Sequence, residues 1–254
     1  TASVGCVVAC GGQLQGCIGA ELTHSLDRAF AKGLAAHDGG AFVVLQSASH
    51  DFTGGGGAFI GPVARRMLHA LGDADPRVKV RSLVARLHGF ELDPFSAWLT
   101  GCFTDAVVTE ELGELPKGLE TIIEVGDTLE RPLTVGPYDL IIGNPPYGRL
   151  KLSPALRTKF SRSLYGHANL YGLFLDFAVH VARPGSGVIA FVTPTGFLCG
   201  EYFKNLRSVL GAQAPLLLLD FVAEREGVFD DVLQETRGAP GAEHPESIVL
   251  RRHH

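Results

Sequence analysis

Apolar and polar positions along this chain form blocks that predict strands and helices in alternation. Short apolar runs are typical of buried strands, and apolar positions spaced by three or four residues indicate amphipathic helices. Strands separated by helices predict a doubly wound, mostly parallel α/β sheet. The expected strands are 41–45, a short strand from His88, 121–127, 138–142, 187–193, 216–221 and 247–250. The expected helices are 21–36, 60–71, 78–87, one from Pro94, one opening at 169–174, and 202–210, with a turn at 194–198.

The second expected strand runs directly into a helix start. Asp93 is placed to accept a hydrogen bond from the first turn of that helix, and Pro94 suits the first helical position because its nitrogen carries no proton. Glu91 precedes them at the strand end. Its carboxylate is placed to accept hydrogen bonds from two ribose hydroxyls, as acids do at this position in dinucleotide-binding folds. The alternative is a second capping carboxylate.

Composition and net charge restrict the class of protein to which this chain can belong. The chain has 254 residues, of which 46% are hydrophobic and 19% charged, as expected for one globular domain with or without a small appendage. Its net charge of -5 is unexpected for a nucleic-acid binder, so any basic surface must be local or come from another domain. Residues 2–20 make a poor signal peptide and are too interrupted to span a membrane. Since Thr1 is not a start residue, we expect a fragment or a processed chain.

The five cysteines do not predict a metal site. They show neither paired metal-ligand spacing nor an adjacent histidine. We therefore expect a reduced intracellular protein with buried thiols and no bound metal. These cysteines are Cys6, Cys10, Cys17, Cys102 and Cys199.

The stretch Asn144-Pro145-Pro146-Tyr147 follows the strand 138–142 and is not a sequence that a packed core requires. The two prolines end the strand because neither can donate a ladder hydrogen bond. The Asn144 side-chain oxygen and the Pro145 carbonyl are two acceptors that can hold both protons of an amino group on a ring. Tyr147 can stack on that ring. The alternative is a strand followed by a simple Asn-Pro turn.

Four glycines at 54–57 open the helix expected from residue 60. Glycines let backbone amides approach a ligand closely, and a helix N-terminus favours an anionic group. A flexible linker is the alternative for this loop.

A basic segment follows Tyr147, with no Asp or Glu from 148 to 167. This composition predicts a phosphate-facing patch, with a solvated helix face as the alternative. Its basic residues are Arg149, Lys151, Arg157, Lys159 and Arg162.

Asn-Pro-Pro-Tyr after an apolar strand resembles the catalytic motif of amino-methyltransferases that use S-adenosylmethionine. These enzymes methylate adenine N6 in DNA, amino groups in RNA, or the side-chain amide of a protein glutamine. The strand from Gly187 to Pro194, then Gly-Phe-Leu and a Phe-x-x-Leu-Arg helix, is similar to the adenine-N6 DNA enzymes of restriction-modification systems, especially those with fused cleavage and methylation activities. Glutamine methyltransferases lack this continuation.

The resemblance implies a class I, Rossmann-like methyltransferase fold and roles for particular residues. The loop around the methionine part of the cofactor would be Asp51, Gly55, Gly57, Ala58 and Phe59, although residues 46–50 intervene here between strand and Asp. Glu91 would bind the ribose and Asp127 the adenine of the cofactor, with a surface turn as the alternative for Asp127. Asn144 would lie beside the reacting methyl group. Tyr147 and Phe229 would sandwich a flipped adenine, with a core aromatic as the alternative for Phe229; Arg149 and Lys151 would face the DNA.

We therefore expect an adenine-N6 DNA methyltransferase domain over 41–250, after an N-terminal helical segment at 1–40, with no target-recognition domain evident. The expected partners are DNA and a separate recognition or nuclease domain or subunit, and the expected location is the bacterial cytoplasm. One alternative is a methyltransferase for RNA or protein glutamine. Another is a non-catalytic subunit that binds cofactor or DNA within a defence complex.

Overall fold

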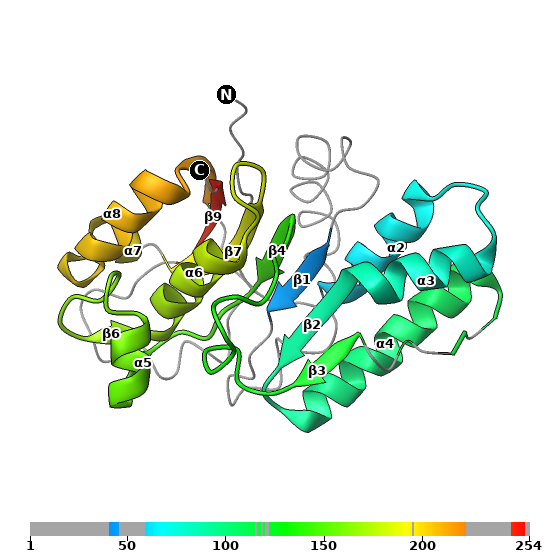
Figure 1. Cartoon of the computed structure of the whole chain (residues 1–254), viewed down its shortest axis with the longest axis horizontal. Helices are drawn as coiled ribbons and strands as arrows, with labels where there is room; N and C mark the ends of the chain where they lie inside the picture. The colour runs from blue at the N-terminus through cyan, green and yellow to red at the C-terminus, as the bar shows by residue number, and fades with distance from the viewer. Residues whose placement is uncertain are drawn as a thin grey trace.

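The computed structural model describes residues 41–45, 59–114, 116–117, 119, 122–194, 196–221 and 245–251. These residues form a seven-stranded sheet of order β3-β2-β1-β4-β7-β9-β8 (Figure 1). β9 pairs antiparallel with both of its neighbours, and the other pairs are parallel, which confirms the doubly wound, mostly parallel sheet. The strands are β1 Phe42–Leu45, β2 Leu87–Glu91, β3 Ile123–Val125, β4 Leu140–Gly143, β7 Val188–Pro194, β8 Leu216–Phe221 and β9 Pro245–Arg251.

The helices form two groups beside the two halves of the sheet. Figure 1 shows α2, α3 and α4 near β1–β3, and α5 to α8 near β7–β9. A small antiparallel pair, β5 Arg149–Leu150 with β6 Ala168–Asn169, lies in the second group. The helices are α2 Ile60–Ala70, α3 Pro76–Arg86, α4 Pro94–Leu112, α5 Pro154–Lys159, α6 Leu170–Val181, α7 Gly196–Cys199, the 3-10 helix Glu201–Phe203 and α8 Lys204–Gln213.

The start of α4 follows from its sequence. The Asp93 carboxylate accepts a hydrogen bond from the Ser96 backbone N–H at 2.7 Å, and Pro94 occupies the first turn. Both features confirm the predicted helix start. Gly113, at a φ of 79°, ends the helix in a left-handed conformation that glycine adopts without steric cost.

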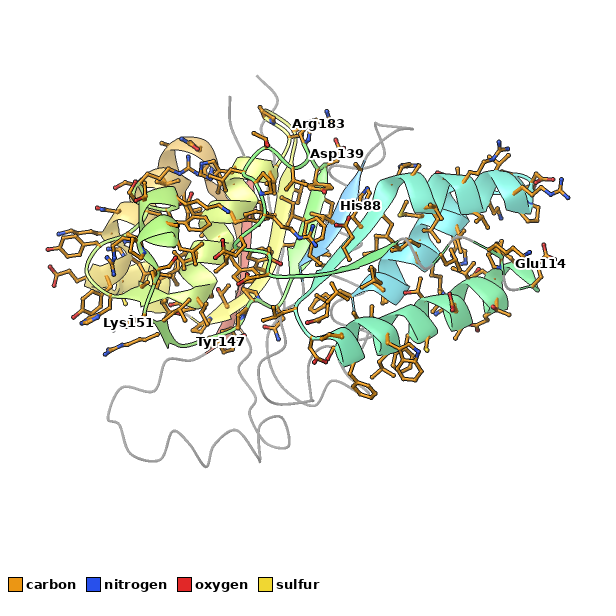
Figure 2. The ribbon with its side chains drawn as sticks, turned by 60° about the horizontal axis from the view of Figure 1, so that its bottom comes forward. His88, Glu114, Asp139, Tyr147, Lys151 and Arg183 are labelled. Carbon is orange, nitrogen blue, oxygen red and sulfur yellow. The ribbon has the colours of Figure 1, made fainter. Side chains whose placement is uncertain are left out.

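The amino end of β4 is fixed by a buried carboxylate. Asp139 Oδ1 accepts from Arg183 Nε at 2.6 Å, and Oδ2 accepts from Arg183 Nη2 at 3.0 Å and from the Ala41 backbone N–H at 2.8 Å. Three segments distant in sequence therefore meet at one side chain, just before β1, β4 and β7 begin. Figure 2 shows Asp139 and Arg183 at the edge of the sheet opposite to Tyr147 and Lys151.

Two expectations need correction. The predicted turn at 194–198 contains the one-turn helix α7, which the hydrogen bond from Gly200 N–H to the Gly196 carbonyl closes at 2.8 Å. Cys102 and Cys199 are exposed rather than buried, because Cys102 lies on the outer side of α4 and Cys199 ends α7. The helix expected over 21–36 lies outside the described residues. Within the described part of the chain, no helix has the length and apolar character to cross a bilayer.

Candidate functional site

The carboxyl ends of β2, β1 and β4 lie side by side. Phe90 of β2 and Gly143 of β4 both pair with Leu45, the last residue of β1. Glu91 and Asn144 therefore lie one residue beyond the same level, on either side of the end of β1. At about 4.8 Å between neighbouring strands, their backbones are about 10 Å apart.

Asn144 and Tyr147 are in direct contact. The Tyr147 hydroxyl donates a hydrogen bond to Asn144 Oδ1 at 2.9 Å. Pro145 is buried, whereas the Tyr147 side chain is 42% exposed. The oxygen predicted to accept an amino proton thus acts as an acceptor at the end of β4, where a tyrosine hydroxyl donates to it.

Two buried aromatic rings support Tyr147. The Tyr171 ring, from the first turn of α6, meets the Tyr147 ring edge-on with centroids 6.3 Å apart. Tyr171 in turn stacks on Phe203 at 5.1 Å and 29°. Both supporting side chains are buried, so they limit the positions that the Tyr147 ring can adopt. Sequence reasoning missed this support, because α6 carries other aromatic residues and nothing local distinguishes Tyr171.

In the basic segment after Tyr147, some side chains are exposed and others bind to groups of the protein itself. Arg149, Lys151 and Arg157 are exposed, as a phosphate-facing patch requires. The expectation of a phosphate-facing side chain is wrong for Lys159 and Arg162. Lys159 Nζ donates to the backbone carbonyls of Leu129 and Arg131, and burial lowers its pKa. Arg162 pairs with a buried carboxylate on α6.

That carboxylate is Asp176, which is fully buried. Its Oδ1 accepts from Arg162 Nε at 2.7 Å, and its Oδ2 accepts from the Ser163 hydroxyl at 2.6 Å. His180 lies 3.3 Å from Oδ1. Burial raises the pKa of Asp176, but the hydrogen bonds from His180, Arg162 and Ser163 outweigh it and hold the pKa below its ordinary value. The cluster ties the segment after α5 to α6.

We predict that this carboxylate makes stability depend on pH. Because the folded-state pKa of Asp176 is depressed, its contribution is present above the unfolded pKa of about 3.9 and is lost as pH falls below it. Asp176→Asn should lower the free energy of unfolding by about 2–4 kcal/mol near neutral pH, since it leaves Arg162 without a charged partner. Denaturant unfolding between about pH 3 and pH 7 measures both effects. An equal difference between parent and variant at every pH would contradict the prediction.

Besides Asn144, three predicted cofactor ligands lie within the described residues. Glu91 is fully buried, and its Oε1 accepts from the Asp93 backbone N–H at 3.0 Å. Asp93 therefore caps α4 and Glu91 does not. Asp127 is exposed, and its Oδ1 accepts from the Leu129 N–H at 2.8 Å within its own turn. The Phe59 side chain packs in the core at the start of α2.

The remaining predicted residues, Asp51, Gly55, Gly57, Ala58 and Phe229, lie outside the described residues.

The connection after Asp127 packs onto β2 and β3. The Arg131 guanidinium lies 3.8 Å from the centroid of the Phe90 ring on β2, and its Nη1 donates to Glu124 of β3 at 2.7 Å. Tyr138, at the end of this connection, lies edge-on to His88 with centroids 5.8 Å apart, and burial raises its pKa to about 12. Strands β2 and β3 and the chain leading to β4 therefore pack together.

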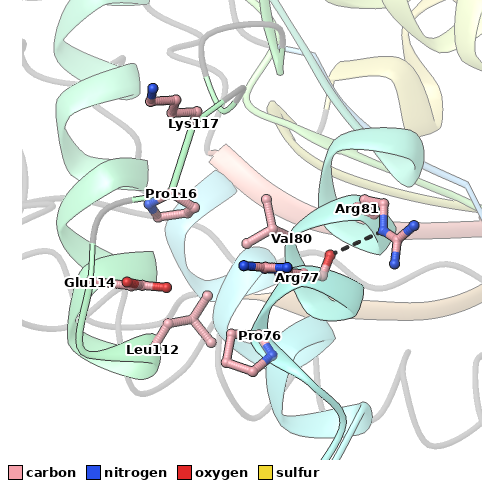
Figure 3. A pocket seen from close by; sticks show the side chains of 8 residues that line it. All are labelled: Pro76, Arg77, Val80, Arg81, Leu112, Glu114, Pro116 and Lys117. Atoms are coloured by element: carbon pink, nitrogen blue, oxygen red, sulfur yellow. Dashed lines mark hydrogen bonds between the residues drawn. The ribbon is translucent and has the colours of Figure 1, made fainter.

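A separate hollow of about 540 Å³ lies between α3 and the chain after α4 (Figure 3). Figure 2 shows Glu114, one of its lining residues, at the end of the molecule opposite to Tyr147 and Lys151. The hollow is therefore not part of the site at the carboxyl ends of β2, β1 and β4, which we call the strand-end site. It is lined by Pro76, Arg77, Val80, Arg81, Leu112, Glu114, Pro116 and Lys117.

Comparisons with known proteins show what the sequence is similar to. Residues 110–229 match the family model described as Eco57I restriction-modification methylase. The Type II methyltransferase M.PaeR7I of Pseudomonas aeruginosa is 26% identical over 188 residues, which are 70% of this chain and 32% of that protein. The chain spans only 19% to 32% of the length of the first curated relatives that it matches.

Solved structures share the fold at low sequence identity. The ATP-dependent Type ISP restriction-modification enzyme LlaBIII, bound to DNA, superposes with a TM-score of 0.63 at 15% identity, over 91% of this chain and 18% of that one. A class I S-adenosylmethionine-dependent methyltransferase of Listeria monocytogenes gives a TM-score of 0.57 at 15% identity, over 93% of this chain and 59% of that one. The fold of the chain is that of the class I methyltransferases.

Proposed function

We propose that this chain, a relative of the Eco57I restriction-modification methylases over residues 110–229, is the catalytic part of a DNA methyltransferase. It would use S-adenosylmethionine and modify the N6 amino group of adenine. The enzyme would act in the bacterial cytoplasm with a recognition or nuclease domain or subunit. The relatives named as Type II methyltransferases and the DNA complex of LlaBIII support the reaction class and the partner.

The observation that carries the proposal is the acceptor at the end of β4. Asn144 Oδ1 accepts a hydrogen bond from the Tyr147 hydroxyl, so a donor from a substrate can replace that hydroxyl. The adjoining Pro145 cannot donate through its backbone, and its carbonyl offers a second acceptor. Two acceptors in sequence suit an NH₂ group, which has two protons to donate.

The residues present also fit the cofactor. A buried carboxylate at the end of β2 can accept hydrogen bonds from hydroxyl groups, and Asn144 lies about 10 Å away across the end of β1. This distance of about 10 Å and the oxygen acceptors at its two ends suit an elongated nucleoside with a reactive group at its far end. Glu91 and Asp127 would hold the nucleoside, and the loop from Asp51 to Phe59 would hold the methionine part. When bound, S-adenosylmethionine supplies a methyl group on a positively charged sulfur.

The chain's own contribution is positioning. Asn144 Oδ1 and the Pro145 carbonyl orient the amino group so that the nitrogen lone pair points toward the cofactor side of the sheet. Tyr147, supported by Tyr171, holds the ring of an adenine that has left the base stack at a cost of a few kcal/mol. Phe229 would cover the opposite face of that ring. Fixed geometry and fixed dipoles of this kind account for much of the rate enhancement in enzymes.

The test is the transfer of labelled methyl groups from S-adenosylmethionine to mixed-sequence duplex DNA, followed by identification of the modified base. We expect N6-methyladenine with the parent chain. Modification of RNA or of a protein glutamine, with duplex DNA left unmodified, would overturn the proposal. If the parent chain does not bind S-adenosylmethionine, the proposed enzyme function is wrong.

Tyr147 provides a second, smaller test. Tyr147→Ala removes the stacking surface and should lower kcat/KM for DNA by roughly five- to 150-fold, from a stacking contribution of about 1–3 kcal/mol. Tyr147→Phe keeps the ring and the contact with Tyr171 and should remain within about threefold of the parent. Steady-state kinetics on duplex DNA compare the two variants. Equal losses in both would show that the hydroxyl, and not the ring, is the important group.

A further inference from the structure

Exposed aromatic and basic side chains continue from Tyr147 across a second surface. The strands β5 and β6 pair Arg149 with Asn169 and Leu150 with Ala168, and Lys151 and His167 are the residues that follow and precede this last pair in the chain. Lys151 and His167 lie just outside this short ladder, and Lys151 is four residues after Tyr147, at most about 13 Å along an extended chain. Figure 2 shows the two side chains near the same end of the molecule.

Tyr202 of the 3-10 helix borders His167. The two rings meet edge-on with centroids 5.4 Å apart, and Tyr202 is 46% exposed. Gly166 lies between Tyr165 and His167 at a φ of 67°, and a Cβ at this position would come within 2.9 Å of the Tyr202 ring. Only glycine permits this close approach without strain. The loop is therefore packed against an aromatic side chain that solvent can still reach.

A lysine on the same surface is held in place. Lys204 Nζ lies 3.3 Å from the centroid of the Tyr165 ring, and Tyr165 is itself 39% exposed. The attraction between an ammonium and an aromatic face restrains a side chain that would otherwise sample many rotamers. The positive charge is thus presented at a defined position rather than on a freely moving chain.

The surrounding sequence is basic although the whole chain is acidic. From 148 to 221 there are eight Lys or Arg residues and three Asp or Glu residues, against a net charge of -5 for the chain. Of the three acids, Asp176 is buried and paired with Arg162, whereas Glu201 is exposed next to Tyr202. Of the eight basic residues, Arg183 pairs with Asp139 and Arg162 with Asp176, whereas a group of four is exposed: Arg149, Lys151, Arg157 and Lys204. These exposed side chains give this part of the chain local positive charge, as a nucleic-acid surface requires.

We propose that the surface formed by Lys151, Tyr165, His167, Tyr202 and Lys204 binds the DNA backbone beside the target nucleotide. The inference rests on the proposed function and extends it to residues outside the strand-end site. Exposed aromatic rings next to restrained cations are the combination that tracks a nucleic-acid backbone and the bases attached to it. Lys151 lies at most about 13 Å from Tyr147, which is no more than roughly four base steps of 3.4 Å, so we place this surface beside the nucleotides that flank the target.

The test measures binding of a fluorescein-labelled mixed-sequence duplex by anisotropy at several salt concentrations, with S-adenosylmethionine present. Lys204→Ala should weaken binding by about three- to tenfold and reduce the slope of log affinity against log salt by about one. Tyr202→Ala should weaken binding by about fivefold or more, with little change in that slope. Lys204→Arg, which keeps the charge and can lie over Tyr165, should restore binding. Lys117→Ala removes the same charge at the remote hollow and should bind like the parent.

Each outcome bears on the proposal. If Lys204→Ala and Tyr202→Ala bind the duplex as Lys117→Ala does, this surface does not contact DNA, and methylation by the parent would leave the proposed function intact. If the parent binds duplex and loses affinity on Lys204→Ala but transfers no methyl group, the surface is supported and the proposed function fails. Thermal unfolding of each variant shows whether a loss of binding comes from misfolding. If Lys204→Ala misfolds, DNA binding by Lys204→Arg decides whether this position supports the proposal.

Discussion

Asn144→Ala should lower methyl transfer to duplex DNA by about 100- to 1000-fold, the loss found when one fixed polar group that stabilises a transition state is removed. The side chain supplies the Oδ1 acceptor at the end of β4, and alanine leaves only the Pro145 carbonyl to hold the amino group. The variant should fold normally, because Asn144 is only half-buried and follows the last residue of its strand. Single-turnover transfer with saturating cofactor and DNA measures the chemical step directly.

Asn144→Asp is the matched comparison. It keeps an oxygen at the Oδ1 position, which can still accept from the substrate, and should retain more activity than the alanine variant. Binding of S-adenosylmethionine by each variant separates a loss of chemistry from a loss of cofactor. Activity of Asn144→Ala within about threefold of the parent would remove Asn144 from the reaction and favour a non-catalytic subunit.

Glu91→Gln should weaken S-adenosylmethionine binding by about thirty- to a hundredfold. Hydrogen bonds to a charged acceptor contribute about 1.5–3 kcal/mol each, and glutamine keeps the shape of the side chain but loses the charge and one acceptor. Because Glu91 is fully buried, its carboxylate interacts with a bound hydroxyl in a medium of low dielectric, where the interaction is stronger than in water. Isothermal titration with S-adenosylmethionine gives the dissociation constant.

Glu114→Gln serves as the control for this second prediction, because it removes the same charge from an exposed position at the opposite end of the molecule. It should bind the cofactor as the parent does. A Glu91→Gln variant with unchanged cofactor affinity and unchanged stability would show that Glu91 is a structural acid that holds Asp93 N–H, and not a ligand.

The strands and the positions of their ends followed from local sequence. Apolar runs marked the parallel strands, Pro145 and Pro146 marked the end of β4, and Asp93 with Pro94 marked the start of α4. Each of these signals acts within a few residues, so it can be recognised before any tertiary contact is known. The shared pairing of β2 and β4 with β1 then brought Glu91 and Asn144 to one edge, as expected.

Contacts between distant segments could not be predicted in this way. The basic run after Tyr147 suggested five equivalent charges, yet Arg162 pairs with Asp176. Charge pattern alone cannot show which lysine or arginine meets a buried acid, because that depends on how α5 and α6 pack. The support that Tyr171 and Phe203 give to Tyr147 has the same origin, since the three residues come from separate elements.

Lys159 connects the two halves of the molecule. Its ammonium joins α5, on the substrate side, to the carbonyls of Leu129 and Arg131, which closely follow the predicted cofactor ligand Asp127. If cofactor binding orders that turn, it also orders α5, and the two ligands become energetically linked. Such coupling is reciprocal: the factor by which S-adenosylmethionine tightens DNA binding must equal the factor by which DNA tightens S-adenosylmethionine binding. One half-buried lysine would then contribute to the cooperativity between the methyl donor and its acceptor.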